Sequence, residues 1–457
     1  MSTHLHFVGV GGISMSGLAR HYQAAGYRVS GCDLRASETT DALQALGMDV
    51  HVGHDPHHLG DVDVLITSAA IASTEPERVE AERRGLPIRR RIDLLAELFS
   101  SHRAIGVTGT HGKSTTSGMV ATILVEQGID PAVQLGATLP SLGGVMRYGQ
   151  GGTLVAEVDE SDPGFAQLIS DVAVVTNLED EHIAGEHDER RTYHATLSDL
   201  ETAVQRYVAQ ARRLVSCADW PGLYELLAGH GDHVSYGESR AADYRVTALT
   251  LEPEGSRFRL AGPAGEVAEV RLVVPGRHNV LNAAAALTAA HAVGVPLQFA
   301  ADALADFRGV GRRWQRWGEV HGALVIDDYA HHPTEVAAAL EAACATGRRV
   351  RAVLQPHRWV RTARHWPALA DAAAAADEVL VLDVYAAGER AIPGISSDRI
   401  VERLRAAGRD ASRHDLVSAQ RYLEDTLAPH DLVITLGAGD VWRVAAGLVR
   451  STASEPA

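Results

Sequence analysis

The 457-residue sequence is poor in cysteine, has no excess of positive charge and contains no long apolar run. Its three cysteines, Cys32, Cys217 and Cys344, have neither the number nor the spacing of a disulfide framework or a metal-ligand motif, which favours a reducing compartment. The formal net charge of −16 argues against nucleic acid or an anionic membrane as the main partner. Apolar stretches stay below the ~18 residues of a membrane-spanning helix, and no basic region precedes an apolar run near residue 1. We therefore expect a cytoplasmic protein that neither inserts into a membrane nor binds nucleic acid.

The composition is that of a globular protein with more than one core. Apolar residues make up 46% of the chain and charged residues 22%. At roughly 150 residues a domain, the length predicts about three domains. Alternating strand and helix patterns predict the α/β class, and we place the domains at residues 1–100, 101–311 and 312–457.

Residues 104–116, Ala-Ile-Gly-Val-Thr-Gly-Thr-His-Gly-Lys-Ser-Thr-Thr, carry the strongest chemical signal. The pattern predicts a short buried strand, a turn with two glycines, and a helix that opens near Ser114. Backbone N–H groups, the helix dipole and the ammonium of Lys113 would together hold a phosphate, and the hydroxyl of Ser114 would hold Mg²⁺. The match to the general phosphate loop is imperfect, because that pattern requires a glycine at Val107. The alternative is a strand-turn-helix corner with an exposed lysine.

A second glycine-rich turn follows the first predicted strand. Residues 5–10 predict a strand, residues 9–17 turn into a helix, and Asp33 follows the next strand about 20 residues on. This order of elements is typical of a nucleotide-binding half-fold. The dinucleotide fingerprint would require glycine at Ser14, so a dehydrogenase and a simple tight corner are the weaker alternatives.

Polar residues also follow two strands of the predicted central domain. Glu157 lies in the strand at 153–158, and Asn177 and His182 lie at or beyond the end of the strand at 172–177. Ligands collect at the carboxyl ends of parallel strands, so a carboxylate beside a phosphate loop is placed to hold Mg²⁺, and we choose Glu157. His182 would bind a second metal or a phosphoryl oxygen, although a lone histidine is usually structural. For the acids, the alternative is a charged loop.

Two further segments point to the same ligand edge. Residues 275–282 open a predicted helix over 283–293, where their polar side chains could cap the helix or face a base or ribose. Residues 307–313 read as a hinge with two arginines suited to phosphate or carboxylate. From residue 320, four predicted strands each end in a polar, aromatic or glycine-bearing loop, which is typical of a doubly wound parallel sheet.

Four histidines, His51, His54, His57 and His58, lie in one short stretch. Their Gly-His-Asp-Pro-His-His context indicates a turn and offers no pair of ligands at i and i+4 of a helix. We interpret the stretch as a solvated loop, with a metal site as the alternative.

Taken in order, the motifs resemble one enzyme family. They are the first glycine-rich turn, Gly-Thr-His-Gly-Lys-Ser-Thr, Glu-Val-Asp-Glu-Ser-Asp, Thr-Asn-Leu-Glu-Asp-Glu-His, Gly-Arg-His-Asn-Val-Leu-Asn, Asp-Asp-Tyr-Ala-His-His-Pro-Thr-Glu and Gln-Pro-His-Arg-Trp-Val-Arg-Thr. From about Phe7 to Val449, this order resembles the Mur ligases. The resemblance implies an N-terminal Rossmann-like domain for a UDP-sugar, a central P-loop-type ATPase with a mostly parallel sheet, and a C-terminal Rossmann-like doubly wound domain for an amino acid.

The resemblance also implies a role for each matching residue. Four would be catalytic: Lys113, His182, His331 and Arg361. ATP would be bound by Gly109, Thr110, His111, Gly112, Lys113, Ser114, Thr115, His278, Asn279, Asn282, Arg313 and Asp328. The other substrates would be bound by Gly11, Gly12, Ile13, Ser14, Met15, Ser16, Asp33, Ser68, Tyr329, His357, Arg358 and Arg361. The metal ligands would be Ser114, Glu157 and His182.

The implied activity is that of an ATP-dependent, amide-forming ligase of peptidoglycan precursor synthesis. It would join L-alanine to the carboxylate of UDP-N-acetylmuramate through an acyl phosphate, as a monomer or weak homodimer. ATP and Mg²⁺ are the expected cofactors, with two ions and with Mn²⁺ as an alternative metal. The competing functions are a ligase that recycles a tripeptide onto the same sugar nucleotide and a non-catalytic binder of sugar nucleotides.

Three positions depart from the family pattern. Ser114 stands where threonine is usual, and since both carry the hydroxyl we expect little change. Glu181 stands where aspartate is usual before His182, which lengthens that arm by a methylene and alters its metal geometry. The loop after His182 has no clear match to the family's aspartate and tyrosine.

Overall fold

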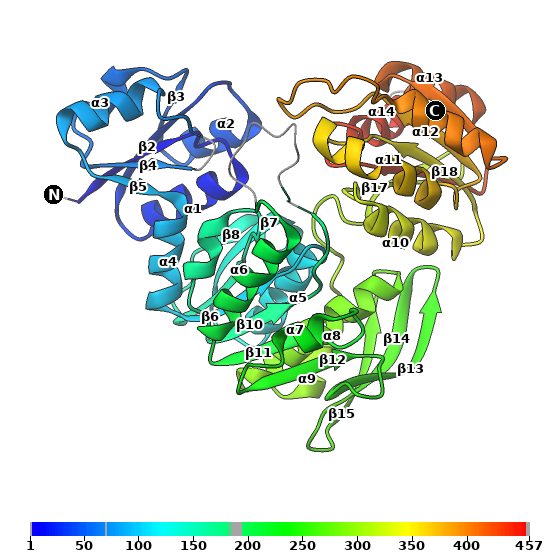
Figure 1. The fold of residues 1–457 in the computed structure, drawn as a ribbon, viewed down its shortest axis with the longest axis horizontal. Helices are drawn as coiled ribbons and strands as arrows, with labels where there is room; N and C mark the ends of the chain where they lie inside the picture. The colour runs from blue at the N-terminus through cyan, green and yellow to red at the C-terminus, as the bar shows by residue number, and fades with distance from the viewer. Residues whose placement is uncertain (1, 69–70, 182, 184–193, 454–457) are drawn as a thin grey trace.

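The computed structural model describes residues 2–68, 71–181, 183 and 194–453. Three β-sheets follow one another along the chain, each with helices packed on it (Figure 1). In this view the first sheet, in blue, and the third, in yellow to red, lie on opposite sides above the second, which runs from cyan to green. The predicted α/β class is confirmed, since most strand pairs are parallel. Among the described helices, none combines the length and apolar character that crossing a membrane requires.

The first sheet is wholly parallel, with the strand order β3-β2-β1-β4-β5. Its strands are β1 (His4–Val8), β2 (Arg28–Asp33), β3 (Asp49–Val52), β4 (Val64–Thr67) and β5 (Ile88–Arg90). Its helices are α1 (Ile13–Ala24), α2 (Glu38–Ala45), the 3₁₀ helix η1 (Pro56–Leu59), α3 (Pro76–Arg84) and α4 (Arg91–Ser101). Because the chain leaves β1 for β2 on one side and reaches β4 on the other, the carboxyl end of β1 is a switch point, where ligands bind in such sheets. The first glycine-rich turn begins there.

The interpretation of the four histidines as a solvated loop is wrong for two of them. The side chain of His57 is 95% exposed, but those of His54 and His58 are only 12% and 16% exposed. His54, just before η1, and His58, within it, both lie against Glu77 of α3, a carboxylate 19 residues beyond His58. The local sequence pattern could not reveal this distant partner.

The second sheet has ten strands in the order β15-β14-β13-β12-β11-β10-β6-β9-β7-β8. They are β6 (Arg103–Thr108), β7 (Ala132–Leu139), β8 (Gly144–Arg147), β9 (Thr153–Glu157), β10 (Val172–Val175), β11 (Arg213–Cys217), β12 (His233–Gly237), β13 (Tyr244–Glu252), β14 (Gly255–Ala261) and β15 (Val267–Leu272). The helices are α5 (Lys113–Glu126), η2 (Pro140–Leu142), η3 (Pro163–Gln167), α6 (Leu197–Ala209), α7 (Leu223–Leu227), α8 (Arg277–Ala292) and α9 (Leu297–Ala303). The pairs at both ends of the sheet are antiparallel, and the centre is parallel. Since β6 pairs with both β9 and β10, the loops after these three strands meet at one edge.

Helix α8 begins at Arg277 rather than at residue 283 as predicted. Gly276, with φ of +96°, ends the preceding extended segment and lets the helix start at once. Asn279 and Asn282 therefore project from the helix itself and are 5% and 8% exposed. The Asn279 amide donates to the Pro275 carbonyl at 2.7 Å, which satisfies its polar group in the first turn.

The third sheet has the order β16-β17-β21-β18-β19-β20 and is parallel except for the β16–β17 pair. Its strands are β16 (Gln315–Val320), β17 (Ala323–Asp328), β18 (Arg349–Leu354), β19 (Glu378–Leu382), β20 (Asp410–His414) and β21 (Asp431–Leu436). Its helices are α10 (Pro333–Cys344), α11 (Trp359–Ala373), α12 (Ser397–Ala406), α13 (Leu416–Thr426) and α14 (Trp442–Ala453). The expected doubly wound sheet is confirmed by two separate core clusters, one on each face.

The first and second sheets share one hydrophobic core, whereas the third has cores of its own. The shared core runs from Leu5 to Val310, and Gly17 of α1 packs on Met146 of β8. The segment near residue 312, between cores, is therefore better placed than the one near residue 100 to permit motion of a whole unit.

A buried ion network in the third sheet gives a first prediction. Arg351 is 1% exposed, and its Nε donates to Glu378 at 2.6 Å. Removing it in Arg351→Ala leaves that carboxylate without its closest cation, so we expect the free energy of unfolding of this domain to fall by about 3–5 kcal/mol. Arg349 also pairs with Glu378, at 3.4 Å, but its side chain is 51% exposed, so Arg349→Ala should cost at most about 1 kcal/mol. Denaturant unfolding of both variants tests the difference; equal losses would contradict it.

Candidate active site

The loop after β6 presents backbone N–H groups at the start of α5. Gly109 and Gly112 have φ of +123° and +82°, conformations that side chains rarely adopt. Their surroundings are equally restrictive: a Cβ at Gly109 would clash with the Thr176 hydroxyl and lie 2.8 Å from the Asn177 carbonyl, and one at Gly112 would clash with Asn282. Such a tight loop at a helix start can follow the oxygens of a phosphate closely.

Replacing Gly109 with alanine tests this cradle. The added methyl group needs a shift of the Thr176 and Asn177 strand end, and overpacking of this kind costs about 1–3 kcal/mol. We expect ATP affinity, measured by calorimetry, to fall by about 10–100-fold. Gly128 is the matched control, because it also has positive φ, +76°, but nothing lies within 4 Å of its Cβ position. Gly128→Ala should leave ATP affinity unchanged, and an equal loss there would contradict the steric argument.

The ammonium of Lys113 lies within the loop. It donates to the carbonyls of Gly109 and Thr110 at 2.7 and 3.1 Å and pairs with the fully buried Glu160 at 2.9 Å. Burial acts to lower the pKa of Lys113, but Glu160 and the neighbouring carboxylates outweigh it, so the pKa is raised and the side chain stays charged. For the acid Glu160, burial instead raises the pKa, although Lys113 opposes the shift. The loop thus holds a charged amine where a phosphate would need one.

The carboxylate of Glu157 and the hydroxyl of Ser114 meet at the edge of the cradle. Ser114 Oγ donates to Glu157 Oε2 at 2.6 Å, and the N–H of Gly136 donates to the same oxygen at 2.9 Å. A Cβ at Gly136 would lie 2.6 Å from Glu157 Oε1, so β7 approaches the carboxylate as closely as a glycine allows. Two oxygen ligands held together suit a hard cation such as Mg²⁺.

One cavity extends from this loop across α8 to the third sheet. Of the predicted ATP residues, the cavity is lined by His111, Gly112, Ser114, Thr115, His278, Asn279, Asn282, Arg313 and Asp328. Gly109, Thr110 and Lys113 belong to the adjoining loop. The wall also includes Asn177, which was expected at the ligand edge, and residues to which the sequence patterns assigned no role, among them Thr176, Cys217, Trp220, Tyr236, Thr334 and Glu335. Trp220 follows β11 and Tyr236 lies near the end of β12, in a part of the chain where no motif marked them.

Burial shapes the charges of this cavity. Burial, and then Arg313, lower the pKa of His278 to about 4, so its ring is neutral at pH 7. Burial raises the pKa of Asp328 to about 6 even though Arg313 opposes the shift. Asp328 accepts the N–H groups of Trp314 and Ala330, both at 2.8 Å, and so fixes the connection into the third sheet.

His111 joins the second sheet to the third. Its Nε2 contacts Glu179, and its Nδ1 lies 3.1 Å from Glu335 of α10. Burial acts to lower the pKa of His111, but the two carboxylates outweigh it and raise the pKa to about 9. Glu179 also accepts from Thr334 at 3.2 Å. The phosphate loop is therefore clamped to the start of α10 by charged hydrogen bonds.

A second contact between these units lies at the start of α11. Arg361 donates through Nε to Glu181 at 2.9 Å and lies 2.9 Å from His357 Nδ1. The rings of His357 and His331 are 5.7 Å apart, and Tyr329 packs edge-on against His331. Burial, followed by Arg361 for His331 and by His331 for His357, lowers their pKa values to about 3 and about 2. Both rings are neutral at pH 7, which leaves Arg361 as the cation of this group.

Arg358 and the arginines of the hinge complete the C-terminal set. Arg358 pairs with Glu389 and has φ of +66°, a strained backbone conformation directly before α11. The guanidinium groups of Arg312 and Arg313 lie 5.1 and 4.9 Å from the ring centre of Tyr329. The structure thus brings the predicted Tyr329, His331, His357 and Arg361 together beside the cavity.

The predicted residues of the first sheet form a separate group at its switch point. The N–H of Gly11 donates to Asp33 at 3.0 Å, and Gly12 and Ile13 are exposed. Ser14 accepts from Arg91 at 2.9 Å and from Gln134 of β7 at 3.1 Å. The side chains of Met15 and Ser16 are buried, so they can face a ligand only through their backbone. Ser68 follows β4 at the same edge.

Two of the sequence-based expectations concern the loop after β10. His182, predicted to be catalytic and a metal ligand, lies outside the described residues. Its neighbour Glu181, a departure from the family pattern, binds Arg361 across 180 residues of sequence. Sequence reasoning gave no role to Glu160, Glu179 or Glu335, although all three stand inside the quoted motifs and could have been examined as partners of the predicted cations.

Known proteins match this chain along most of its length. Three family models match: "Mur ligase family, catalytic domain" at residues 4–103, "Mur ligase middle domain" at 107–290, and "Mur ligase, glutamate ligase domain" at 312–439. The UDP-N-acetylmuramate–L-alanine ligase of Deinococcus radiodurans is 44% identical, covering 99% of this chain and 94% of that protein. The ligase of the same name from Acidothermus cellulolyticus is 43% identical over 95% of this chain and 91% of that protein.

Solved structures share the arrangement. The UDP-N-acetylmuramate-alanine ligase of Thermotoga maritima has a TM-score of 0.85 and 28% identity, covering 99% of this chain and 100% of that one. A murein peptide ligase from Psychrobacter arcticus, with a TM-score of 0.71 and 22% identity over the whole of both chains, shows the fold alone.

Proposed function

The chain belongs to the Mur ligase family, and on that premise we propose that it joins L-alanine to the carboxylate of UDP-N-acetylmuramate, with ATP cleaved to ADP and phosphate. One observation carries the proposal: the phosphate loop and the Arg361 group, from different sheets, meet at one junction. An amide-forming ligase needs this arrangement, because the activated acid and the amine must react in one place. The names of the relatives identify the acid and the amine.

Activation of the carboxylate is the first task. A carboxylate and an ammonium form a salt at neutral pH, so the carboxylate must first attack the γ-phosphate of ATP to give an acyl phosphate. Phosphoryl transfer depends mainly on alignment and on charge stabilisation. Lys113 and the N–H groups at the start of α5 would supply both, while the N–H groups of Thr110 and His111 hold the loop in shape by donating to Asn177.

The residues present fit a magnesium ion. Ser114 and Glu157 place a hydroxyl and a carboxylate oxygen 2.6 Å apart beside the phosphate loop. Mg²⁺ bound there would neutralise charge on the phosphate oxygens. The family resemblance implies a second ion at His182, which is outside the described residues.

Attack by the amine is the second task. Arg361, beside two neutral histidines, is the cation suited to the carboxylate of alanine. His331 then orients the substrate as a neutral hydrogen-bonding ring. The contacts of His111 and Glu181 hold the two units together at the junction, which would help to shield an acyl phosphate from water. We place the reaction in the cytoplasm, where ATP is available. We propose that the active protein is a monomer or a weak homodimer.

Phosphate release from ATP and Mg²⁺ with UDP-N-acetylmuramate tests the proposal. L-alanine, the L-Ala-γ-D-Glu-diaminopimelate tripeptide and no amine are compared. We expect release that requires both the sugar nucleotide and L-alanine. Release with the tripeptide only would instead assign the recycling reaction, and sugar-nucleotide binding without release under any condition would indicate a non-catalytic binder.

A further inference from the structure

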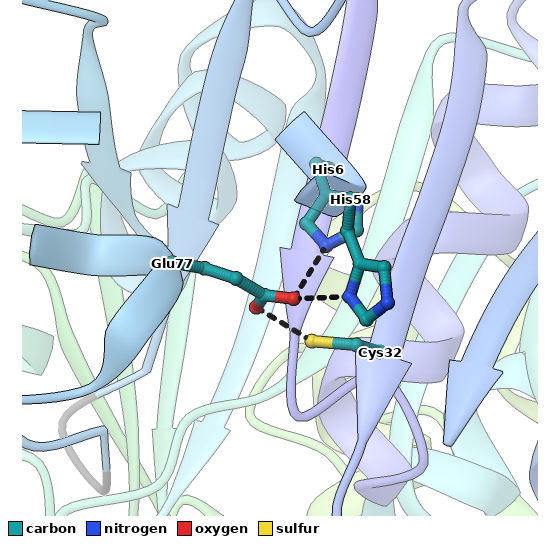
Figure 2. Close-up of side chains that lie close together, drawn as sticks. All are labelled: His6, Cys32, His58 and Glu77. Carbon is teal, nitrogen blue, oxygen red and sulfur yellow. Dashed lines mark hydrogen bonds and ion pairs between the residues drawn. The ribbon is translucent and has the colours of Figure 1, made fainter. Parts of the chain in front are cut away.

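Four side chains of types that can ligate a metal meet in the first domain, outside the candidate active site. Figure 2 shows His6 of β1, Cys32 of β2, His58 of η1 and Glu77 of α3 pointing toward one another. Cys32 belongs to a small core cluster, with Val8, Leu59 and Ala81, that is separate from the core beneath α1. The group is therefore enclosed between the sheet and the η1–α3 layer.

The ligand atoms already lie close to metal-binding positions. One atom from each side chain lies within 4.8 Å of each of the others. The carboxylate of Glu77 is central: Cys32 Sγ is 2.8 Å from Oε2, His58 Nδ1 is 2.6 Å from Oε1, and His6 Nε2 is 3.7 Å from Oε1. In a tetrahedral zinc site, bonds of about 2.0–2.3 Å place the ligands roughly 3.3–3.7 Å apart. The His6–Glu77 pair is already at that spacing, and shifts of under about 1 Å would bring the two shorter pairs to it.

A hydrogen-bonding gap points to a ligand. His6 is fully buried, and its Nε2 makes no hydrogen bond of normal length, since the nearest carboxylate oxygen of Glu77 is 3.7 Å away; this is a costly state for a buried polar atom. Its other nitrogen, Nδ1, lies 2.8 Å from the hydroxyl of Ser30. If Nδ1 donates this hydrogen bond, Nε2 presents its lone pair to the cluster, as in metal sites where a second partner fixes the histidine tautomer.

Charge and chemistry select the ion. We propose that His6, Cys32, His58 and Glu77 form a closed zinc site that stabilises the first domain. Two imidazoles, a thiolate and a carboxylate form a four-ligand set that suits Zn²⁺, whereas Mg²⁺ and Ca²⁺ prefer oxygen. Binding releases the Cys32 thiol proton to solvent, and thiolate and carboxylate then balance the two positive charges of the ion. With all four positions filled by protein, the site is structural rather than catalytic.

The residues around the cluster offer a route by which an ion could enter and a structural role for the bound ion. His54 Nδ1 lies 3.1 Å from Cys32 Sγ and can donate to a thiolate, and both His54 and His58 reach partly to the surface, where an ion can enter. The backbone carbonyl of Cys32 accepts the N–H groups of Gly9 and Val10 at 2.8 and 2.9 Å. The ion would therefore tie η1 and α3 to the strand that holds the glycine-rich turn in place.

Cobalt(II) titration of the full-length, tag-free chain tests the proposal independently of the proposed reaction. The protein is stripped with a chelator and titrated in excess Mg²⁺, so that oxygen-rich sites are filled. We expect one Co²⁺ per chain with tetrahedral visible bands and a thiolate-to-cobalt band in the near ultraviolet, all displaced by one equivalent of Zn²⁺. Loss of a residue that only supports a metal ligand typically lowers metal affinity by about 10–100-fold. His58 and Glu77 would bind the ion directly, so His58→Ala and Glu77→Gln should each lower the Co²⁺ affinity by at least about 100-fold.

Cysteine variants locate the bound ion. Cys32→Ala should lose the near-ultraviolet band, and Cys344→Ser, which alters an exposed thiol elsewhere, should keep it. Zn²⁺ should also raise the Tm of the wild-type chain and not that of Cys32→Ala. The proposal is overturned if the wild-type chain shows no thiolate band at one equivalent, or if Cys32→Ala retains the wild-type spectrum. The wild-type measurement decides the question even if a variant fails to fold.

Discussion

Lys113→Ala is expected to lower the rate of phosphate release by at least about 10²–10³-fold. Removing one preorganised donor from a developing charge typically costs this much, and Lys113 is the only lysine in the chain, so no neighbouring ammonium can replace it. The loss should appear in kcat under saturating ATP, UDP-N-acetylmuramate and L-alanine. Binding of UDP-N-acetylmuramate, measured by calorimetry, should be unchanged, because the first domain's glycine-rich turn is a separate group; loss of that binding would contradict this division of labour.

The double variant Lys113→Ala/Glu160→Gln separates chemistry from stability. Glu160 is fully buried beside Lys113, so the single substitution also removes a neutralising charge from a carboxylate. Replacing that carboxylate with an amide should recover part of the Tm but none of the phosphate release. Recovered activity would mean that Lys113 acts only through Glu160.

The single lysine also allows a direct test of ATP binding by chemical labelling. ATP should protect the side chain of Lys113 from an amine-reactive reagent.

Glu157→Gln is expected to lower kcat by about 10²-fold and to raise the Mg²⁺ concentration needed for half-maximal activity by at least about tenfold. A metal ion that neutralises transferring phosphate contributes several kcal/mol, and an amide oxygen is a weaker ligand than a carboxylate. The amide can still accept from Ser114 and Gly136, so the loop should keep its shape. Activity is measured against Mg²⁺ concentration at saturating substrates.

Glu126→Gln is the matched control for charge. Glu126 is the last residue of α5, at the end of the helix away from the phosphate loop, and the substitution changes net charge by the same amount. Its Mg²⁺ dependence should equal that of the wild type. An equal shift in both variants would show a general electrostatic effect, and an unchanged Mg²⁺ requirement in Glu157→Gln would remove Glu157 from the metal site.

Features that depend on neighbouring residues could be predicted from the sequence. The strand, turn and helix around residues 104–116 follow from local periodicity and from glycines at the two positions whose φ is positive. Four strands of the third sheet, β17, β18, β19 and β21, were predicted for the same reason, whereas its edge strands β16 and β20 were not. The family resemblance then gave the roles, because collinear motifs carry information that no single motif does. Local pattern was least successful at helix starts: α8 begins at Arg277, where hydrogen-bonded asparagines continue the helix through a polar stretch.

Only the tertiary structure decided which charged groups meet. His111 contacts Glu335, Arg361 contacts Glu181, and Cys32 contacts Glu77, pairs that no local pattern connects. The crossover connections of parallel sheets bring distant strand ends to one edge, and the packing of one unit on another then selects the partners. The sequence by itself determined the fold class, the phosphate loop and the list of reactive side chains. The structure determined their neighbours, and with them the charge of His111, the neutrality of His331 and the grouping of four ligands around Glu77, because burial and proximity set the energy of each charge.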